Sequence, residues 1–129
     1  MQPEESLYPE EWLRIAEKDL ARVERMLADD DPEAAGFYLQ QGLEKYLKAF
    51  LLSKGWSLKR IHDLETLLND ASVYNPSLGE FRLLCQEITG YYMVERYPFS
   101  GMTSLTNEEV KEALESAKTL IDRLISHTE

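Results

Sequence analysis

The stretch PEAAGFYLQQGLEKYLKAFLLSKG, residues 32–55, decides the fold. Asp31 is a suitable N-cap before it, Pro32 suits a first helical turn, and Gly55 suits a helix end. The pattern predicts a long helix from Pro32 to about Lys54, with apolar residues around most of its circumference. A helix of this kind lies at the centre of a bundle, or it faces a partner as well as its own core. The apolar residues are Ala35, Phe37, Tyr38, Leu39, Leu43, Tyr46, Leu47, Phe50 and Leu51.

Helical periodicity continues on both sides of this segment. Apolar residues recur at three- and four-residue spacing, and glycine and proline lie mainly between the periodic stretches. The expected elements are helices at Pro9–Ala28, His62–Ala71 and Ser77–Glu95, a last helix after Thr106, and loops at Gly55–Ile61 and Arg96–Thr106. Ser77–Glu80 and Thr106–Glu109 are expected to form capping boxes at two helix starts. No segment alternates long enough for a strand, so we predict an all-α fold: an antiparallel up-and-down four-helix bundle plus one short helix.

Length and hydropathy predict one domain. The chain has 129 residues, the size of a single domain, and we expect residues 1–129 to form one bundle with an ordered core at about 9–126. No apolar run approaches the ~20 residues that a membrane helix needs. The segment Met1–Glu11 is acidic and does not resemble a signal peptide. We therefore expect a cytoplasmic protein that makes no membrane contact.

Charge and cysteine content exclude several classes of function. With 14 Lys and Arg against 24 Asp and Glu, the net charge is −10, which is unlike a nonspecific nucleic-acid binder. Contact with nucleic acid would need a local basic patch or a small site. A single cysteine, Cys85, excludes an intramolecular disulfide and a multi-cysteine zinc site, and its apolar neighbours predict a buried residue. Only two histidines are present, so we expect no metal site and no cofactor.

The first group of polar residues lies on the central helix. Gln41, Glu44, Lys45 and Lys48 share one face because they are three, four and seven residues apart. One interpretation is a solvated face with a Gln41–Lys45 contact and a Glu44–Lys48 ion pair. The other is a functional stripe on a helix that is otherwise buried. Spacing alone favours the solvated face.

Two further groups follow along the chain. Residues 59–64, KRIHDL, place two basic residues and a histidine at a helix start, where a phosphate would be favoured. In the alternative interpretation, His62 and Asp63 are capping or packing residues. Residues 91–99, YYMVERYPF, place Arg96 among aromatic residues at a helix end. Arginine there can stabilise the helix dipole, or it can hold a stacked nucleotide together with the rings.

Taken in order, these groups resemble the HEPN family of small helical domains. The matching stretches are QQGLEKYLKA at 40–49, HDL at 62–64 and YYMVERYP at 91–98, within Pro9–Ser126. The resemblance implies a helical bundle that commonly dimerises. It also implies a minimal nucleotidyltransferase partner in a toxin–antitoxin-like pair. Many members are metal-independent ribonucleases, and kanamycin-type nucleotidyltransferases carry a similar bundle as their second domain.

The ribonuclease members carry an arginine followed four to six residues later by a histidine, and the two meet at the dimer cleft. Such a pair supplies a cation for phosphate and an imidazole for proton transfer. Arg96 matches the arginine in position, but residues 97–102 contain no histidine. Arg123 precedes His127 by four positions at the end of the chain, and Arg60 is two positions from His62. The ribonuclease signature is therefore absent, and His62 is the imidazole that a rearranged site could use.

The resemblance and the residues together favour a nucleotide-binding interaction module that pairs with a minimal nucleotidyltransferase. No residue is assigned a catalytic role; Arg96 and His62 are the candidates. The alternative is a metal-independent RNA-cleaving toxin built on those two residues, and a third possibility is a helical dimer without a ligand. The expected nucleotide-binding residues are Arg96, Tyr92 and Tyr97 for the phosphate and base, with Lys48, Glu44, Arg60, His62 and Asp63 contributing.

The aromatic residues of the central helix also predict a homodimer. Phe37, Tyr38, Tyr46 and Phe50 widen its apolar circumference beyond what one four-helix core should need. We therefore expect a twofold dimer. Its ligand would be a nucleotide or RNA.

Overall fold

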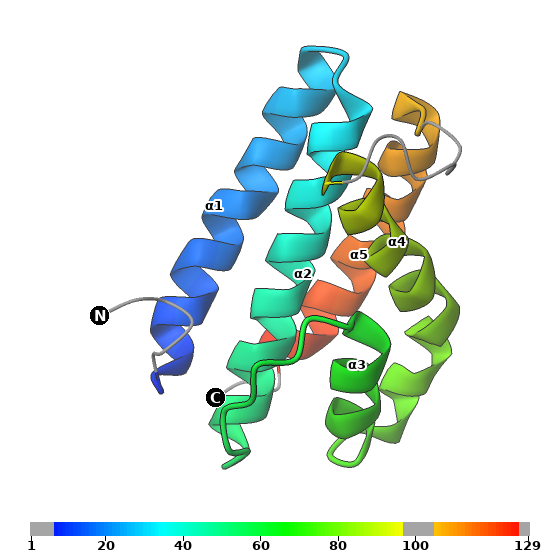
Figure 1. The fold of residues 1–129 in the computed structure, drawn as a ribbon. Coiled ribbons are helices and arrows are strands. Elements are labelled where there is room, and N and C mark those ends of the chain that lie inside the picture. Colours follow the sequence, from blue (N-terminus) through cyan, green and yellow to red (C-terminus); the bar gives the residue numbers. More distant parts are fainter. Residues whose placement is uncertain (1–6, 97–104, 127–129) are drawn as a thin grey trace.

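Figure 1 shows the computed structural model, which describes residues 7–96 and 105–126, with side chains described for 7–92 and 105–126. The helices are α1 (Pro9–Ala28), α2 (Pro32–Ser53), α3 (Leu64–Ser72), the 3-10 helix η2 (Pro76–Phe81), α4 (Arg82–Arg96) and α5 (Asn107–Ser126). These described parts contain no strand, and the all-α prediction is confirmed. None of these helices is both long enough and apolar enough to cross a membrane.

Helix α2 is the centre of the fold. It packs against α1 on one side and against α3, α4 and α5 on the other, whereas α1 packs mainly against α2. Figure 1 shows α1, α2, α4 and α5 running in alternating directions along the chain. The apolar circumference read from the sequence therefore has a cause within one chain, since α2 has neighbours on most of its sides.

The core lies mostly on the side of α2 that faces α3, α4 and α5. Leu39, Leu43 and Leu47 of α2 are fully buried there, in one cluster with residues of those three helices. A Cβ added to Gly36 would lie 3.1 Å from Tyr91 Cβ of α4, which shows how closely the two backbones approach. Transfer of these side chains from water, worth ~1.5–3 kcal/mol for each large one, is the main stabilising contribution.

Several expected helix ends are confirmed. Asp31 accepts a hydrogen bond from Ala34 N (3.3 Å). Thr106 and Glu109 form the reciprocal capping box, with Thr106 N donating to Glu109 Oε1 (3.1 Å) and Glu109 N donating to Thr106 Oγ1 (3.2 Å). Gly55 has φ 88°, a conformation that glycine adopts without strain and that turns the chain away from α2. Helix α2 ends at Ser53, with Lys54 as its C-cap.

Two expected helix starts are wrong. Helix α3 begins at Leu64 rather than at His62, because Asp63 is its N-cap and accepts from Glu65 N (3.4 Å). The capping box at Ser77–Glu80 does not form. Asn75 Oδ1 accepts from both Ser77 N (3.3 Å) and Ser77 Oγ (2.8 Å), and Pro76–Phe81 is a 3-10 helix. Asn75 is therefore the cap instead of Ser77, and α4 begins at Arg82.

The aromatic residues cited for a dimer are largely used within the monomer. Tyr46 is 5% exposed and Phe50 is 1% exposed. Phe37 stacks on Tyr92 of α4 (ring centroids 5.6 Å apart), and the guanidinium of Arg22 lies 5.5 Å from the Tyr38 ring. The excess of apolar surface that we inferred for α2 is thus wrong for Tyr46 and Phe50. The homodimer itself stays a prediction.

Candidate functional site

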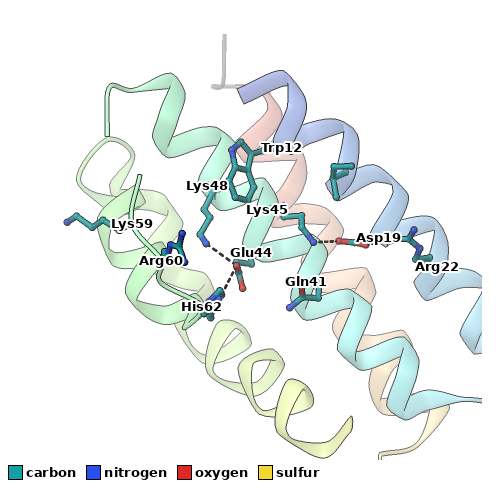
Figure 2. Close-up of a pocket in the computed structure, with 11 residues that line it drawn as sticks. Trp12, Asp19, Arg22, Gln41, Glu44, Lys45, Lys48, Lys59, Arg60 and His62 are labelled. Atoms are coloured by element: carbon teal, nitrogen blue, oxygen red, sulfur yellow. Dashed lines mark hydrogen bonds and ion pairs between the residues drawn. The ribbon is translucent and has the colours of Figure 1, made fainter. Parts of the chain in front are cut away.

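A cavity of about 480 Å³ lies beside α2, between α1 and the segment that joins α2 to α3. Figure 2 shows α1 on one side of it and the connecting segment on the other. Its size is within the ~300–1,000 Å³ typical of small-molecule sites. The lining residues are Trp12, Ile15, Asp19, Arg22, Gln41, Glu44, Lys45, Lys48, Lys59, Arg60 and His62.

The lining of this cavity is basic, in contrast to the chain as a whole. It contains five lysines and arginines against two carboxylates, whereas the net charge of the chain is −10. The rest of the chain is therefore even more acidic than its net charge indicates. Salt screens charges that are more than about 8–10 Å away. A small anion that has come this close to the cavity is therefore attracted by its basic lining more than it is repelled by the acidic rest of the chain.

Glu44 is the centre of the hydrogen bonds in this region. Its Oε2 accepts from Lys48 Nζ (3.0 Å) and lies 3.0 Å from His62 Nδ1, while its Oε1 accepts from Gln40 Nε2 (3.1 Å). The Glu44 side chain is 7% exposed and that of Lys48 is 3% exposed. The predicted Glu44–Lys48 ion pair is present, but the interpretation of a solvated face is wrong, because this pair is buried. We call Gln40, Gln41, Glu44, Lys45 and Lys48 the polar seam of α2.

Gln40 joins the polar seam to the segment before α3. It is 1% exposed, and its Nε2 donates both to Glu44 Oε1 and to the main-chain oxygen of His62 (3.1 Å). Gln41 Nε2 donates to Gln40 Oε1 (2.6 Å), which orients the Gln40 amide. The ring and the backbone of His62 are therefore both held by residues of α2.

Lys48 carries a buried charge that needs this arrangement. Its ammonium is paired with Glu44 and lies 5.4 Å from the centre of the Trp12 ring on α1. A buried ammonium is costly unless it is paired, and a ring face adds electrostatic stabilisation. Lys48 is thus mainly engaged with protein groups.

A second ion-pair group links α2 to α1. Asp19 is 2% exposed; its Oδ2 accepts from Lys45 Nζ (2.6 Å) and its Oδ1 accepts from Arg22 (2.7 Å). The expected Gln41–Lys45 contact is wrong, because Lys45 donates to Asp19 instead. One carboxylate therefore serves two cations, which leaves this group with an excess positive charge.

Gly42 permits the close approach that brings Asp19 to Lys45. A Cβ at Gly42 would lie 2.7 Å from Leu20 Cδ2 and 3.4 Å from Asp19 Cβ, both on α1. A larger residue would have to displace the Leu20 side chain. Glycine in mid-helix is unfavourable in itself, so its presence here is explained by packing.

Lys59 and Arg60 provide cations that no carboxylate of the described residues neutralises. Both are exposed, and neither makes a hydrogen bond or ion pair with the residues that the structure describes. The Lys59 ammonium lies 6.0 Å from the centre of the Trp56 ring. In Figure 2 Lys59 extends away from the Glu44–Lys48 pair, and Arg60 lies on the side nearer to it. Arg60 is thus the better placed of the two to bind an anion in the cavity.

The contact between His62 and Glu44 determines which ring nitrogen is available. A carboxylate only accepts hydrogen bonds, so Nδ1 carries the hydrogen of this contact. The side chain is 71% exposed, and Nε2 has no partner among the described residues. His62 therefore presents Nε2 at the cavity, either as an acceptor or, in a protonated ring, as a donor.

The N-terminus of α3 has fewer unpaired backbone N–H groups for a phosphate than the sequence indicated. Leu64 N donates to Thr89 Oγ1 (3.2 Å) and Glu65 N donates to Asp63 Oδ1 (3.4 Å). Thr66 Oγ1 also donates to Asp63, at 2.6 Å. The first amides of the helix are therefore already bonded within the chain, and Asp63 caps α3 without lining the cavity.

Tyr92, a predicted site residue near the end of α4, lies apart from the cavity. Tyr92 stacks on Phe37, which precedes Glu44 by seven residues, or ~10 Å along the axis of α2. Arg96 is the last residue of α4, with its side chain outside the described part, and Tyr97 lies wholly outside it. Of the predicted binding residues, the structure brings together four at the cavity: Glu44, Lys48, Arg60 and His62.

Sequence reasoning missed the contribution of α1. Trp12, Ala16, Asp19 and Val23 are all buried on one face of α1. A carboxylate on an otherwise apolar stripe is a detectable signal, because it must meet a cation when the stripe is packed. Gln40 gave no such signal, since an amide next to Gln41 can equally well be solvated.

Cys85 is buried, as the sequence predicted. Burial raises the pKa of its thiol to about 12, with the nearby carboxylates of Asp63 and Glu65 adding to the effect. A thiol with this pKa is not a reactive nucleophile near neutral pH. Among the side chains described, those of residues 7–92 and 105–126, no three histidine, cysteine or carboxylate groups gather where they could hold a metal ion.

Comparison with known proteins gave one match. A family model described as HEPN domain matches residues 9–127. No curated protein and no solved structure matches the chain. The match covers every helix described above.

Proposed function

Because this chain belongs to the HEPN domain family, we propose that it is a nucleotide-binding interaction module. Its partner would be a minimal nucleotidyltransferase, in a toxin–antitoxin-type pair within the cytoplasm, and it would lack the ribonuclease motif. The partner part of the proposal is supported by the resemblance of residues 40–49, 62–64 and 91–98 to the family. The ligand part is supported by the cavity.

The observation that carries the ligand proposal is an excess of positive charge in a small cavity of an acidic chain. Arg60 and Lys59 are exposed and unpaired among the described residues, and His62 adds a ring nitrogen beside them. Guanidinium and ammonium groups are the usual ligands of phosphate. We propose that a nucleotide binds with its phosphate at Arg60, Lys59 and His62.

The test is calorimetric titration of the purified protein with AMP. We expect saturable binding that Arg60→Ala weakens at least about tenfold, the effect of losing one charge-assisted contact. Lys18→Ala is the control, because Lys18 is exposed on α1 outside the cavity and its loss changes the net charge equally. Equal losses in both variants, or no binding by the unmodified chain, would contradict the proposal.

The same titration with Arg96→Ala tests the residue that the family resemblance singled out. Loss of binding in a variant that still folds would extend the site toward the end of α4. Unchanged binding would remove Arg96 from the site and support binding at the cavity beside α2.

A metal-independent ribonuclease is the second candidate. It is favoured by the placement of His62, whose ring is held by Glu44 beside the cations of residues 59 and 60; imidazole and cation are the groups that such cleavage needs. The test is incubation with total RNA in EDTA. Cleavage that is lost in both Arg96→Ala and His62→Ala would replace the binding proposal, and absence of cleavage would favour it.

We also propose that the protein is a homodimer. The remaining support from the sequence argument is the pair Phe37 and Tyr38 on α2, which are half-buried in the monomer. Light scattering at micromolar concentration should give twice the chain mass of 15.0 kDa. A monomeric mass would remove this proposal and leave the ligand proposal intact.

A further inference from the structure

We infer that the group selected by this cavity is a phosphomonoester, the terminal phosphate of a mononucleotide or of a phosphorylated RNA end, rather than a phosphodiester within a strand. The inference rests on the proposed function and specifies the chemistry of its ligand. It follows from the charges that remain uncompensated in the cavity, from the orientation of His62, and from the acidity of the surrounding chain.

The first step concerns the compensation of charge. Glu44 neutralises Lys48, and Asp19 can neutralise only one of Lys45 and Arg22, since it pairs with both. The exposed cations at residues 59 and 60 face no carboxylate within hydrogen-bonding distance among the described residues. A phosphomonoester carries about −1.5 to −2 near pH 7, whereas a diester carries one negative charge. The monoester therefore matches the excess positive charge more completely.

The second step concerns the proton. His62 donates from Nδ1 to Glu44 and leaves Nε2 for a ligand. A phosphomonoester carries an ionisable proton, so a hydrogen bond between Nε2 and the monoester can form with the hydrogen on either partner. A diester has no such proton. His62 therefore adds a hydrogen bond in both protonation states of a monoester.

The third step concerns the rigidity of the site. The ring of His62 is held by Glu44 and its main-chain oxygen by Gln40, and both of these residues are buried on α2. A ligand that binds Nε2 and Arg60 therefore does not have to order the end of this segment. Preorganisation of this kind raises both affinity and selectivity.

The fourth step concerns length. A strand interior continues on both sides of the bound phosphate, and beyond the cavity it would meet a chain whose remaining charge is strongly negative. A terminal phosphate presents one end only. Repulsion along the strand thus adds to the preference for an end.

The experiment compares four probes by calorimetry: AMP, its methyl phosphodiester, and a short RNA with either a 5′-phosphate or a 5′-hydroxyl. We expect AMP to bind at least about tenfold more tightly than its methyl ester, because one charge-assisted contact is lost. The phosphorylated RNA should bind more tightly than the hydroxyl RNA. If it binds as tightly as AMP, strand ends are a source of the ligand; if it binds more weakly, free mononucleotides are favoured.

Two results would overturn the inference in different ways. Equal affinity for AMP and its methyl ester contradicts the monoester inference but leaves the proposed function in place. Absence of binding by all four probes contradicts the proposed function as well. Affinity that rises for the hydroxyl RNA above that for AMP would also overturn the inference, because it would indicate a strand-binding surface.

The variant His62→Asn isolates the role of Nε2. An asparagine amide can still donate to Glu44, but it offers nothing in place of Nε2. We expect AMP affinity to fall about tenfold while affinity for the methyl ester changes little, so that the ratio between them approaches one. Circular dichroism would confirm folding. An unchanged ratio would show that His62 does not make the distinction.

Discussion

Both sides of α2 carry residues that are almost fully buried, but the two sides are stabilised differently. On the side toward α3, α4 and α5, Leu39 and Leu43 are completely buried among other apolar residues. On the side toward α1 and the segment before α3, Gln40, Glu44 and Lys48 are 1%, 5% and 2% exposed. The apolar side is stabilised by removal of surface from water, and the polar seam by ion pairs and hydrogen bonds among its charges and amides.

The comparison shows that burial does not by itself distinguish core from site. The apolar side tolerates errors in packing at a gradual cost, because each lost methylene costs ~1 kcal/mol. In the polar seam the cost in stability is abrupt, because the loss of one partner leaves a buried charge or amide without a hydrogen bond. The cavity adjoins the polar seam, so the same pairing that stabilises α2 also orients the residues that would meet a ligand.

The largest expected effect comes from breaking one buried ion pair. Glu44→Ala should lower the free energy of unfolding by about 3–5 kcal/mol, because Lys48 is left buried and unpaired. Leu43→Ala, on the apolar side, should cost about 2–5 kcal/mol through the cavity that it leaves. Urea unfolding followed by circular dichroism measures both.

The double variant Glu44→Leu with Lys48→Met separates the two explanations. Replacement of a whole buried pair by apolar residues of similar volume is often neutral or stabilising. We expect the double variant to recover most of the stability that Glu44→Ala loses, while its affinity for AMP falls. A double variant as unstable as the single one would show that packing, not the unpaired charge, sets the cost.

Alkaline pH next tests two titratable groups of the buried core. Burial, followed by the charge of Glu17, raises the pKa of Tyr46 from 10.0 to about 12, and burial raises that of Cys85 from 9.0 to about 12. Both groups keep their protons longer in the folded chain, so their contribution to stability is complete below pH 9 and is lost progressively up to about pH 12. The free energy of unfolding should fall across this range, and less steeply in Tyr46→Phe. An equal slope in that variant would contradict the assignment.

The two glycines of α2 that face other helices sharpen the comparison further. Gly36→Ala should destabilise by about 1–3 kcal/mol, because the new Cβ would lie 3.1 Å from the Cβ of buried Tyr91. Gly42→Ala meets the end of the half-buried Leu20 side chain and gains ~1 kcal/mol of helix propensity, so its stability should change by less than about 1 kcal/mol. Thermal unfolding compares them; the reverse order would indicate that α1 is the more rigid neighbour.

Gln40→Met should have a smaller effect on global stability and a larger local one. It removes the hydrogen bonds to Glu44 and to the His62 oxygen, at about 1 kcal/mol of unfolding free energy. Amide hydrogen exchange in residues 56–63 should become faster, and AMP affinity should fall. Unchanged exchange there would show that Gln40 does not hold this segment.

The smallest expected effect is at an exposed ion pair. Lys118 lies 3.4 Å from Glu24, and both side chains are about half exposed. Lys118→Ala should change the free energy of unfolding by less than about 0.5 kcal/mol. Urea unfolding in the same series provides the baseline against which the buried pair of the polar seam is judged; a cost above 1 kcal/mol would remove the contrast between exposed and buried pairs.

Helices were predictable to within a few residues because their signals are local. Apolar periodicity and the Thr106–Glu109 capping box depend on residues three and four positions apart, which a helix brings together wherever it lies. The Ser77–Glu80 box failed for a local reason as well, since Asn75 competes for the same amide. The Ser77–Glu80 and Thr106–Glu109 segments look alike in the sequence, and only their hydrogen bonds in the structure distinguish them.

The candidate site was predictable only in part. Glu44, Lys48, Arg60 and His62 were singled out, and the cavity includes them. The sequence could not show that Asp19, 26 residues before Lys45, would take the partner that we had assigned to Gln41.

The sequence by itself determined the helical class, the single buried cysteine, the central helix and the family. These depend on composition and on spacing along the chain. The tertiary structure alone decided that Gln40, Glu44 and Lys48 are buried, that α1 supplies Asp19 to Lys45, and that Gln40 and Glu44 hold His62 beside Arg60. The physical reason is that the role of a charged side chain depends on its neighbours. Packing determines whether it faces an opposite charge, an aromatic ring or solvent.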